Sequence, residues 1–142
     1  MFRLLLLVLL CQIYESSSDD SSHWPHIQKV EVTIIGNYYM PEEEVKEHIY
    51  NYGQRHGLSD EEMQVHLVEK CGNDSLSPKR FEVHVTQCND FRKYLLHAGR
   101  FMHDLKMIHV KCDHAHYAHC LKSICKETDY VDLVKCAYNN MI

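Results

Sequence analysis

The chain has 142 residues, of which 45% are hydrophobic and 25% are charged, and its formal net charge at pH 7 is -5. This acidic balance, without any lysine or arginine cluster, argues against nucleic acid or an anionic membrane surface as partner, because both require a concentrated positive face. A chain of this length can bury a hydrophobic core and is expected to form one globular domain.

The amino-terminal segment has the pattern of a secretory signal peptide. Arg3 precedes an unbroken apolar run from Leu4 to Leu10, which is shorter than the ~20 residues that a transmembrane helix needs. Ser16 and Ser18 supply the small residues expected before a cleavage site at Asp19. We therefore expect a secreted protein without a membrane anchor, in which residues 1–18 are the signal peptide, 19–28 a disordered leader and 29–142 a single disulfide-stabilised domain.

The first half of this domain is expected to contain one strand and two helices. Residues 29–35 place β-branched side chains in near alternation before Gly36, which predicts a strand. Pro41 and the three glutamates after it favour a helix that ends near Gly53. A capping-box pattern at residues 59–62 predicts a second helix, which continues toward Cys71 and ends at Gly72.

The second half has a mainly helical pattern. Residues 81–86 are ambiguous, because they alternate like a strand but also share a helical face with Cys88; as a strand they would pair with residues 29–35. Apolar residues from Phe91 to Cys112 keep a three-four spacing, which predicts one long helix, and a last helix is expected from about Asp129. The expected fold class is therefore mainly α, a small disulfide-crosslinked helical domain with room for one short two-stranded β element.

Cysteine usage and one glycosylation sequon agree with secretion. Of the seven cysteines, Cys11 lies in the signal peptide, which leaves an even number in the mature chain. If residues 112–120 are helical, their ends lie about 12 Å apart, too far for a mutual disulfide, and otherwise the pairing stays open. The short paired spacings of a zinc site are absent. Asn73 begins the sequon and is the candidate glycosylation site, and the expected half-cystines are Cys71, Cys88, Cys112, Cys120, Cys125 and Cys136.

Histidine is unusually frequent, with 12 residues, several of them gathered around Cys112 and Cys120. If the long helix continues through this region, His109, His116 and His119 lie near one face, because offsets of three and seven bring side chains together. Neutral imidazole binds Cu(II) and Zn(II), so these three residues are candidate metal ligands, with His114 as the alternate. The competing interpretation is a solvated histidine-rich surface that holds no metal, and no cofactor is otherwise expected.

The residues contain no convincing catalytic motif, and a non-enzymatic protein is expected. His103-Asp104 resembles the catalytic pair of secreted phospholipases A2, but the paired cysteines and the glycine-rich calcium loop of that family are absent. There is no G-x-S-x-G elbow, and oxidised cysteines cannot act as nucleophiles.

Two families of secreted, six-cysteine helical proteins offer partial resemblances. The chain resembles arthropod odorant-binding proteins in mature length, acidity and a carboxyl-terminal cysteine helix that begins after Cys125, which implies a carrier of small hydrophobic ligands. It lacks the C-x3-C pair of that family and closes with C-x10-C in place of C-x8-C. It is also similar to the tick microplusin group in its histidine content and in the C-x4-C step from Cys120, which implies copper sequestration and antimicrobial action. Its other cysteine spacings depart from that group, so neither family is assigned.

Three functions of different classes follow. The first is a carrier that encloses a small hydrophobic molecule among aromatic and methionine side chains of the long helix, although the same side chains could simply fill the core: Phe91, Tyr94, Phe101, Met102 and Met107. The second is a metal-sequestering antimicrobial protein that uses the histidines. The third is a venom or salivary effector that binds an extracellular target protein, for which size, secretion and crosslinking are compatible.

Overall fold

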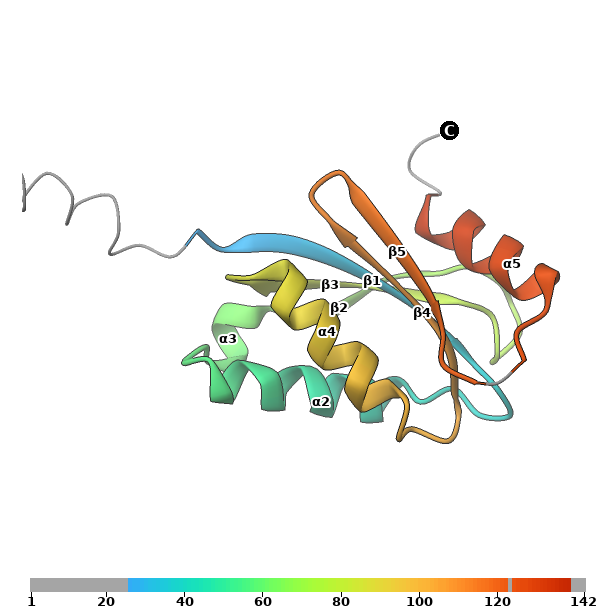
Figure 1. Ribbon diagram of the computed structural model, residues 1–142, viewed down its shortest axis with the longest axis horizontal. Coiled ribbons are helices and arrows are strands. Elements are labelled where there is room, and N and C mark those ends of the chain that lie inside the picture. The colour runs from blue at the N-terminus through green and yellow to red at the C-terminus, as the bar shows by residue number, and fades with distance from the viewer. Residues whose placement is uncertain (1–25, 123, 139–142) are drawn as a thin grey trace, which may run out of the picture.

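The computed structural model describes residues 26–122 and 124–138. The expected signal peptide, its expected cleavage site and most of the expected leader therefore lie outside the described residues. Within them, the chain forms a five-stranded antiparallel sheet with the strand order β2-β3-β1-β4-β5 (Figure 1). The expectation of a mainly α fold was wrong, because the sheet is the central element and the helices pack on it.

The elements follow one another in a β-α-β-β-α-β order, to which a short helix (α3), a fifth strand (β5) and a last helix (α5) are added. The strands are β1 (Gln28–Gly36), β2 (His66–Lys70), β3 (Lys79–Val85), β4 (Leu105–Cys112) and β5 (Ala115–Cys120). The helices are α2 (Glu42–Arg55), α3 (Asp60–Met63), α4 (Cys88–Gly99) and α5 (Glu127–Ala137). Without β5 and α5, this chain order and strand order are those of the ferredoxin-like, split β-α-β arrangement. That arrangement supports many unrelated functions, so it does not by itself assign one.

The two faces of the sheet are covered unequally. Helices α2 and α4 lie along one face and enclose the main core, and α5 lies on the opposite face (Figure 1). On the α5 face, Ile35 and Met107 pack against Leu133 near the end where β1 finishes. Polar residues of β1, β3 and β4 occupy the middle of the same face, and Thr33, Arg80 and His109 are buried there.

Several expected elements are confirmed. Residues 29–35 form the central strand β1, and residues 81–86 lie mostly in its antiparallel partner β3, with Val30 opposite Val83. The helix that begins after Pro41 is α2, and the last helix is α5. The alternation of β-branched side chains therefore identified β1, and residues 81–86, which the sequence left open between strand and helix, lie mostly in a strand.

The prediction of one long helix over residues 91–112 was wrong. Helix α4 ends at Gly99, and the second part of the segment is strand β4 followed by the hairpin strand β5. Strand β4 is buried on both faces, because it lies between β1 and β5 with helices on either side. Apolar residues therefore occur on both faces of β4, and Leu105, Ile108 and Cys112 also keep a helical three-four spacing.

The expected helix over residues 59–72 is also much shorter. Ser59 caps α3 as predicted, because its Oγ accepts a hydrogen bond from the backbone N–H of Glu62 at 3.2 Å. Gln64 then adopts a left-handed conformation with a φ of 47°, which ends the helix. Residues 66–70 instead form the edge strand β2, which pairs with β3.

Three disulfides connect the elements, and all six expected half-cystines take part. Cys71–Cys136 joins the segment after β2 to α5, and Cys88–Cys112 joins the start of α4 to the end of β4. Cys120–Cys125 closes the segment that follows β5. These bonds are compatible with a secreted protein. No helix in the described part of the chain is sufficiently long and apolar to cross a membrane.

Candidate functional site

The structure does not bring the five expected pocket residues together. Phe91 and Met102 are buried in the core beneath α2 and α4, and Tyr94 is partly buried beside them. Met107 is buried on the opposite face of the sheet against α5. Phe101 is 72% exposed in the segment that follows α4. The expected helix, which would have aligned these side chains, ends at Gly99. The five side chains therefore lie in three different places: the main core, the α5 side of the sheet and the surface.

The clefts of the described surface have polar walls. One cleft of about 570 Å³ lies between α5, the end of β1 and the connection from β2 to β3, and a second of about 390 Å³ lies beside Cys88–Cys112. None of the five expected pocket residues lines either cleft. The larger cleft is bordered by side chains of both charges, among them Lys70, Lys106, Asp129, Asp132 and Lys135.

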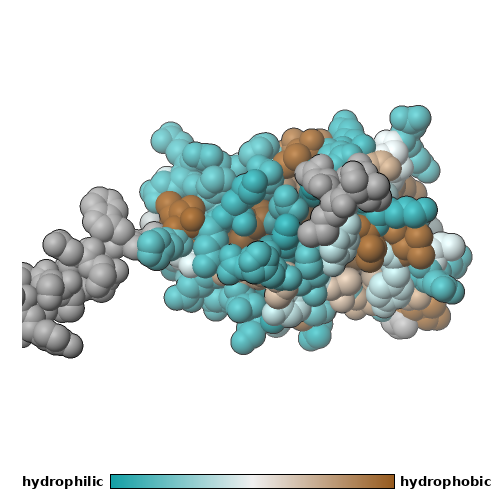
Figure 2. All heavy atoms as spheres, turned by 90° about the horizontal axis from the view of Figure 1, so that it is seen from above, coloured by the Kyte–Doolittle hydropathy of each residue, from teal (hydrophilic) through white to brown (hydrophobic). Residues whose placement is uncertain are grey.

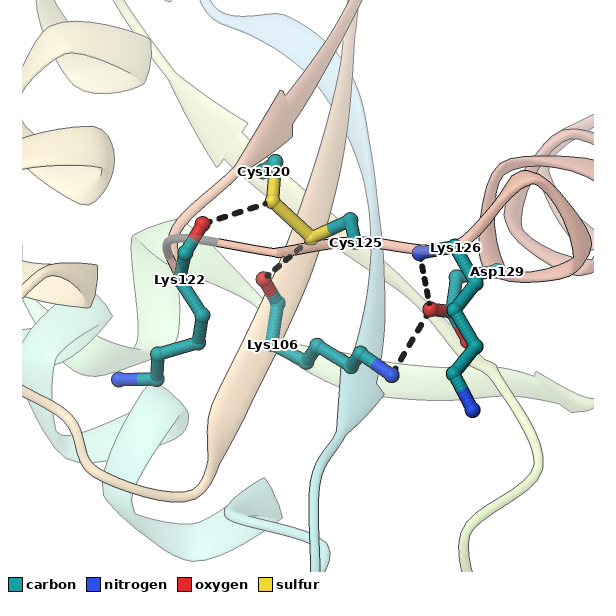
Figure 3. The surroundings of a disulfide bond; sticks show 6 residues. All are labelled: Lys106, Cys120, Lys122, Cys125, Lys126 and Asp129. Atoms are coloured by element: carbon teal, nitrogen blue, oxygen red, sulfur yellow. Dashed lines mark hydrogen bonds and ion pairs between the residues drawn. A yellow bond between two sulfur atoms is a disulfide. The ribbon is translucent and has the colours of Figure 1, made fainter.

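An ion pair fixes α5 beside this cleft (Figure 3). Lys106 Nζ lies 2.8 Å from Asp129 Oδ2, and the backbone N–H of Lys126 donates to the same oxygen at 2.8 Å. Burial alone would raise the pKa of Asp129, but the hydrogen bonds from Lys106 and Lys126 outweigh that effect and lower it. Asp129 therefore remains charged and joins the start of α5 to β4.

Three connecting segments meet at one end of the sheet: residues 37–41 after β1, 100–104 before β4, and 121–122 with 124–126 after β5 (Figure 1). They meet because β1 ends where its antiparallel neighbour β4 begins, and β5 ends opposite the same part of β4. We call these three segments the loop end.

Main-chain hydrogen bonds and a disulfide hold the loop end together. The backbone N–H of Asn37 donates to the carbonyl of Asp104 at 2.6 Å, and Lys122 Nζ donates to the carbonyl of Met102 at 2.6 Å. The backbone N–H of Leu121 donates to the carbonyl of Lys106 at 2.9 Å, beside the Cys120–Cys125 bond (Figure 3). Each segment is thus fixed to another segment or to β4.

Large apolar side chains are exposed on all three segments. Tyr38 is 88% exposed, Ile124 75%, Phe101 72% and Tyr39 64%. Seen from above in Figure 2, hydrophobic patches lie at the right-hand end of the molecule, where these segments lie in Figure 1, and also at other places on this face. The expected pocket set contained only Phe101 of these four. The Tyr-Tyr pair between the end of the predicted strand and Pro41 was the available sequence signal for Tyr38 and Tyr39.

The glycine at the end of β1 explains the tight course of the first segment. A Cβ atom at Gly36 would overlap the carbonyl oxygen of Tyr39 and approach the Cα of Met40 at 3.1 Å. Any other residue would therefore push the Tyr38-Tyr39 turn away from the sheet. The position of both tyrosines depends on this close approach.

Of the three expected metal ligands, only two lie on one face. His109 and His116 point to the α5 side from neighbouring strands, whereas His119 is an odd number of residues from His116 on β5 and lies on the other side. There the guanidinium of Arg92 donates to Nε2 of His119 at 3.3 Å. His114 is exposed in the β4–β5 turn. The expected helical offsets do not apply, because the segment is a hairpin.

The two histidines on the α5 side are in direct contact. Nε2 of His109 lies 3.3 Å from Nδ1 of His116, and the Tyr138 ring stacks on His116 with 4.2 Å between centroids. His109 is only 2% exposed, and its Nδ1 has no hydrogen-bond partner among the described residues. In the part of the chain that the structure describes, no group of three or more His, Cys, Asp or Glu side chains is placed to hold a metal ion.

Burial and neighbouring charges keep both imidazoles neutral. Burial lowers the pKa of His109 to about 4, and the charges of His116, Lys111 and His119 contribute in the same direction. Burial and Lys111 also lower the pKa of His116, against the opposing effect of Glu31. The pair therefore presents nitrogen lone pairs rather than positive charge at neutral pH.

A further polar group, missed from the sequence, joins α2 to α4. The hydroxyl of Tyr52 donates to Oδ2 of Asp90 at 2.9 Å, and Nε2 of His56 lies 3.0 Å from the same oxygen. Burial, together with the Asp90 charge, raises the pKa of Tyr52. Because Tyr52 is fully buried and stacks on His56, this group acts as a connection between the helices.

The candidate glycosylation site lies on the surface. Asn73 is exposed in the connection between β2 and β3, two residues after Cys71. A glycan attached there would project from the same end of the sheet as the loop end, because β2 ends and β3 begins at that end.

Comparisons with protein families, with curated proteins and with solved structures found no match for this chain.

Proposed function

We propose that this protein is a secreted, non-enzymatic binding protein that recognises an extracellular protein partner through its loop end. The observation that carries the proposal is the exposure of four large apolar side chains, Tyr38, Tyr39, Phe101 and Ile124, on three adjacent segments. Aromatic residues are enriched at protein interfaces and among the residues that dominate binding energy. A folded domain that exposes such a group presents a natural contact surface.

The loop end is also held in one arrangement before binding. The hydrogen bonds of Asn37 and Lys122 and the Cys120–Cys125 disulfide fix the three segments relative to β4. A surface fixed in advance loses less conformational entropy on binding than a flexible one. The proposal therefore places recognition on the segments and the rigid support on the sheet.

The carrier function has less support from the geometry. Its proposed pocket residues Phe91, Met102 and Met107 fill the two cores on opposite faces of the sheet, and Phe101 is on the surface. The two clefts described above have polar walls, and none of these residues lines them. A carrier of apolar molecules would instead enclose its ligand with apolar side chains.

Surface substitutions test the proposal without disturbing the core. The mature protein is screened against an array of extracellular domains, and each binder is measured again with Tyr38→Ser, Phe101→Ser and Ile124→Ser. Ile27→Ser and Val68→Ser are the matched controls, because both side chains are exposed but lie outside the loop end.

The expected result is a partner whose affinity falls by about tenfold or more with at least one loop-end variant, and changes by less than about twofold with the controls. Equal loss with the control variants, or binding that none of the loop-end variants weakens, would contradict the proposal. So would the absence of any partner together with co-purified lipid in native mass spectra, which would favour the carrier.

A further inference from the structure

We propose that His109 and His116 form a two-ligand site for a divalent transition-metal ion, such as Zn(II), on the α5 side of the sheet. The two residues lie diagonally across β4 and β5, since His109 pairs with Ala118 and His116 with Lys111. Their side chains meet through Nε2 of His109 and Nδ1 of His116. The site comes from the hairpin, not from the helical spacing that had suggested a site with His119.

The separation of the two nitrogens suits shared coordination. They lie 3.3 Å apart, within hydrogen-bond range, so in the metal-free protein one ring can donate an N–H to the other. Two nitrogens that each lie about 2.05 Å from a tetrahedral ion are separated by about 3.3 Å. The pair is therefore spaced as two ligands of one ion would be.

The surroundings fix the imidazoles. Tyr138 stacks on His116 and lies edge-on to His109, with 5.6 Å between the centroids of Tyr138 and His109. His109 is held by burial between β1 and β5, so its ring cannot turn freely. Ligands that are already oriented lose little entropy on binding an ion.

The ligand type selects the class of metal. Two imidazole nitrogens favour Zn(II) or Cu(II) over Mg(II) or Ca(II), which prefer oxygen ligands. Water would complete the coordination, because the protein supplies only two nitrogens. Lys111 lies opposite His116 and opposes the positive ion, while Glu31 on β1 partly offsets it. The affinity should thus be weaker than that of a four-ligand structural zinc site.

Calorimetric titration of the metal-free mature protein with zinc chloride up to about 1 mM tests the site. We expect one ion per chain, and a loss of affinity of about tenfold or more in His116→Ala. His119→Ala and His114→Ala are matched controls, because they remove histidines of the same hairpin outside the pair, and should change the affinity by less than about twofold. Magnesium chloride should produce no binding.

Histidine ring resonances give a second measurement that needs no His109 variant. Zinc should shift or broaden the ring signals of both His109 and His116 and leave those of His119 unchanged. The proposal is overturned if wild-type protein binds no zinc, if His116→Ala binds as tightly as wild type, or if His119→Ala loses as much affinity. Binding that perturbs other histidines only would also overturn it.

Discussion

The backbone N–H of Asn37 donates to the carbonyl of Asp104 at 2.6 Å, which joins the segment after β1 to the segment before β4. The bond places Tyr38 and Tyr39 close in space to the segment that contains Phe101, although about 60 residues separate them in sequence. The arrangement of the loop end therefore depends on the register of β1 against β4, which the buried core specifies.

Phe101 and Met102 are neighbours in sequence with opposite environments. Met102 is 1% exposed and Phe101 is 72% exposed. We expect Met102→Ala to reduce the free energy of unfolding by about 2–5 kcal/mol, because it leaves a cavity in the core. Phe101→Ser should change it by about 0.5 kcal/mol or less. Urea unfolding followed by circular dichroism measures both, and a larger loss from Phe101→Ser would show that the segment is oriented differently.

The Cys71–Cys136 and Cys120–Cys125 disulfides should differ in their contributions to stability. Their cysteines are separated by 65 and 5 residues, respectively. Chain-entropy arguments assign about 4 kcal/mol to the longer loop and about 2 kcal/mol to the shorter one. We expect a Cys71→Ser, Cys136→Ser double variant to unfold at lower denaturant than a Cys120→Ser, Cys125→Ser double variant. The reverse order in equilibrium unfolding, or different pairs in mapped peptides, would contradict this assignment.

His109 should make the stability of the metal-free protein depend on pH. Its pKa is about 4 in the folded protein, against about 6.5 for an exposed histidine. Between these values the unfolded chain binds a proton that the folded protein does not, so stability falls as the pH falls from about 6.5 to about 4. Above about pH 6.5 this contribution is fully present, and it amounts to about 3 kcal/mol.

Urea unfolding in the presence of a chelator, at several pH values from about 4 to 7.5, checks the histidine contribution. The matched comparison is His109→Gln, which removes the titrating group, because other groups such as Asp129 also titrate in acid. The difference in stability between wild type and variant should shrink as the pH falls. A difference that stays constant over this range would exclude His109 as the responsible group.

The Tyr52–Asp90 hydrogen bond makes a further prediction about α2 and α4. Asp90→Ala leaves the buried hydroxyl of Tyr52 without its acceptor, whereas Tyr52→Phe removes the hydroxyl itself. We therefore expect Asp90→Ala to cost about 1–3 kcal/mol of unfolding free energy and Tyr52→Phe to cost less. Thermal and denaturant unfolding of the two variants decide the order, and equal costs would mean that the hydroxyl has another partner.

The sequence predicted the elements whose pattern has one explanation. Strand β1 alternates in a way that suits the sheet, and α2 begins after Pro41 with a run of acids, whereas the pattern of residues 81–86 in β3 also suited a helix. Strand β4 was missed because it has apolar residues on both buried faces, such as Met107 and Ile108, and therefore lacks a regular apolar-polar alternation. Strand β5 was missed because alanine and histidine, which dominate it, have little preference for strands.

The same error determined which site residues were found. Assigning helix to residues 109–119 grouped His119 with His109 and His116, whereas the hairpin separates His119 and brings the other two into contact. The prediction of one long helix also grouped Phe101 with the buried residues Phe91 and Met102, whereas Phe101 is exposed. The loop end could not be assembled from sequence, because it depends on which strands are neighbours in the sheet.

Site-specific photocrosslinking tests recognition through the loop end most directly. A photoreactive phenylalanine analogue is placed singly at Tyr38, Phe101 or Ile124, and at the control positions Ile27 and Val68, and each protein is irradiated with the partner found in the extracellular-domain screen. We expect covalent adducts with the partner from loop-end positions and none from the controls. Adducts from Ile27 or Val68 alone, or equal adducts from all five positions, would contradict it.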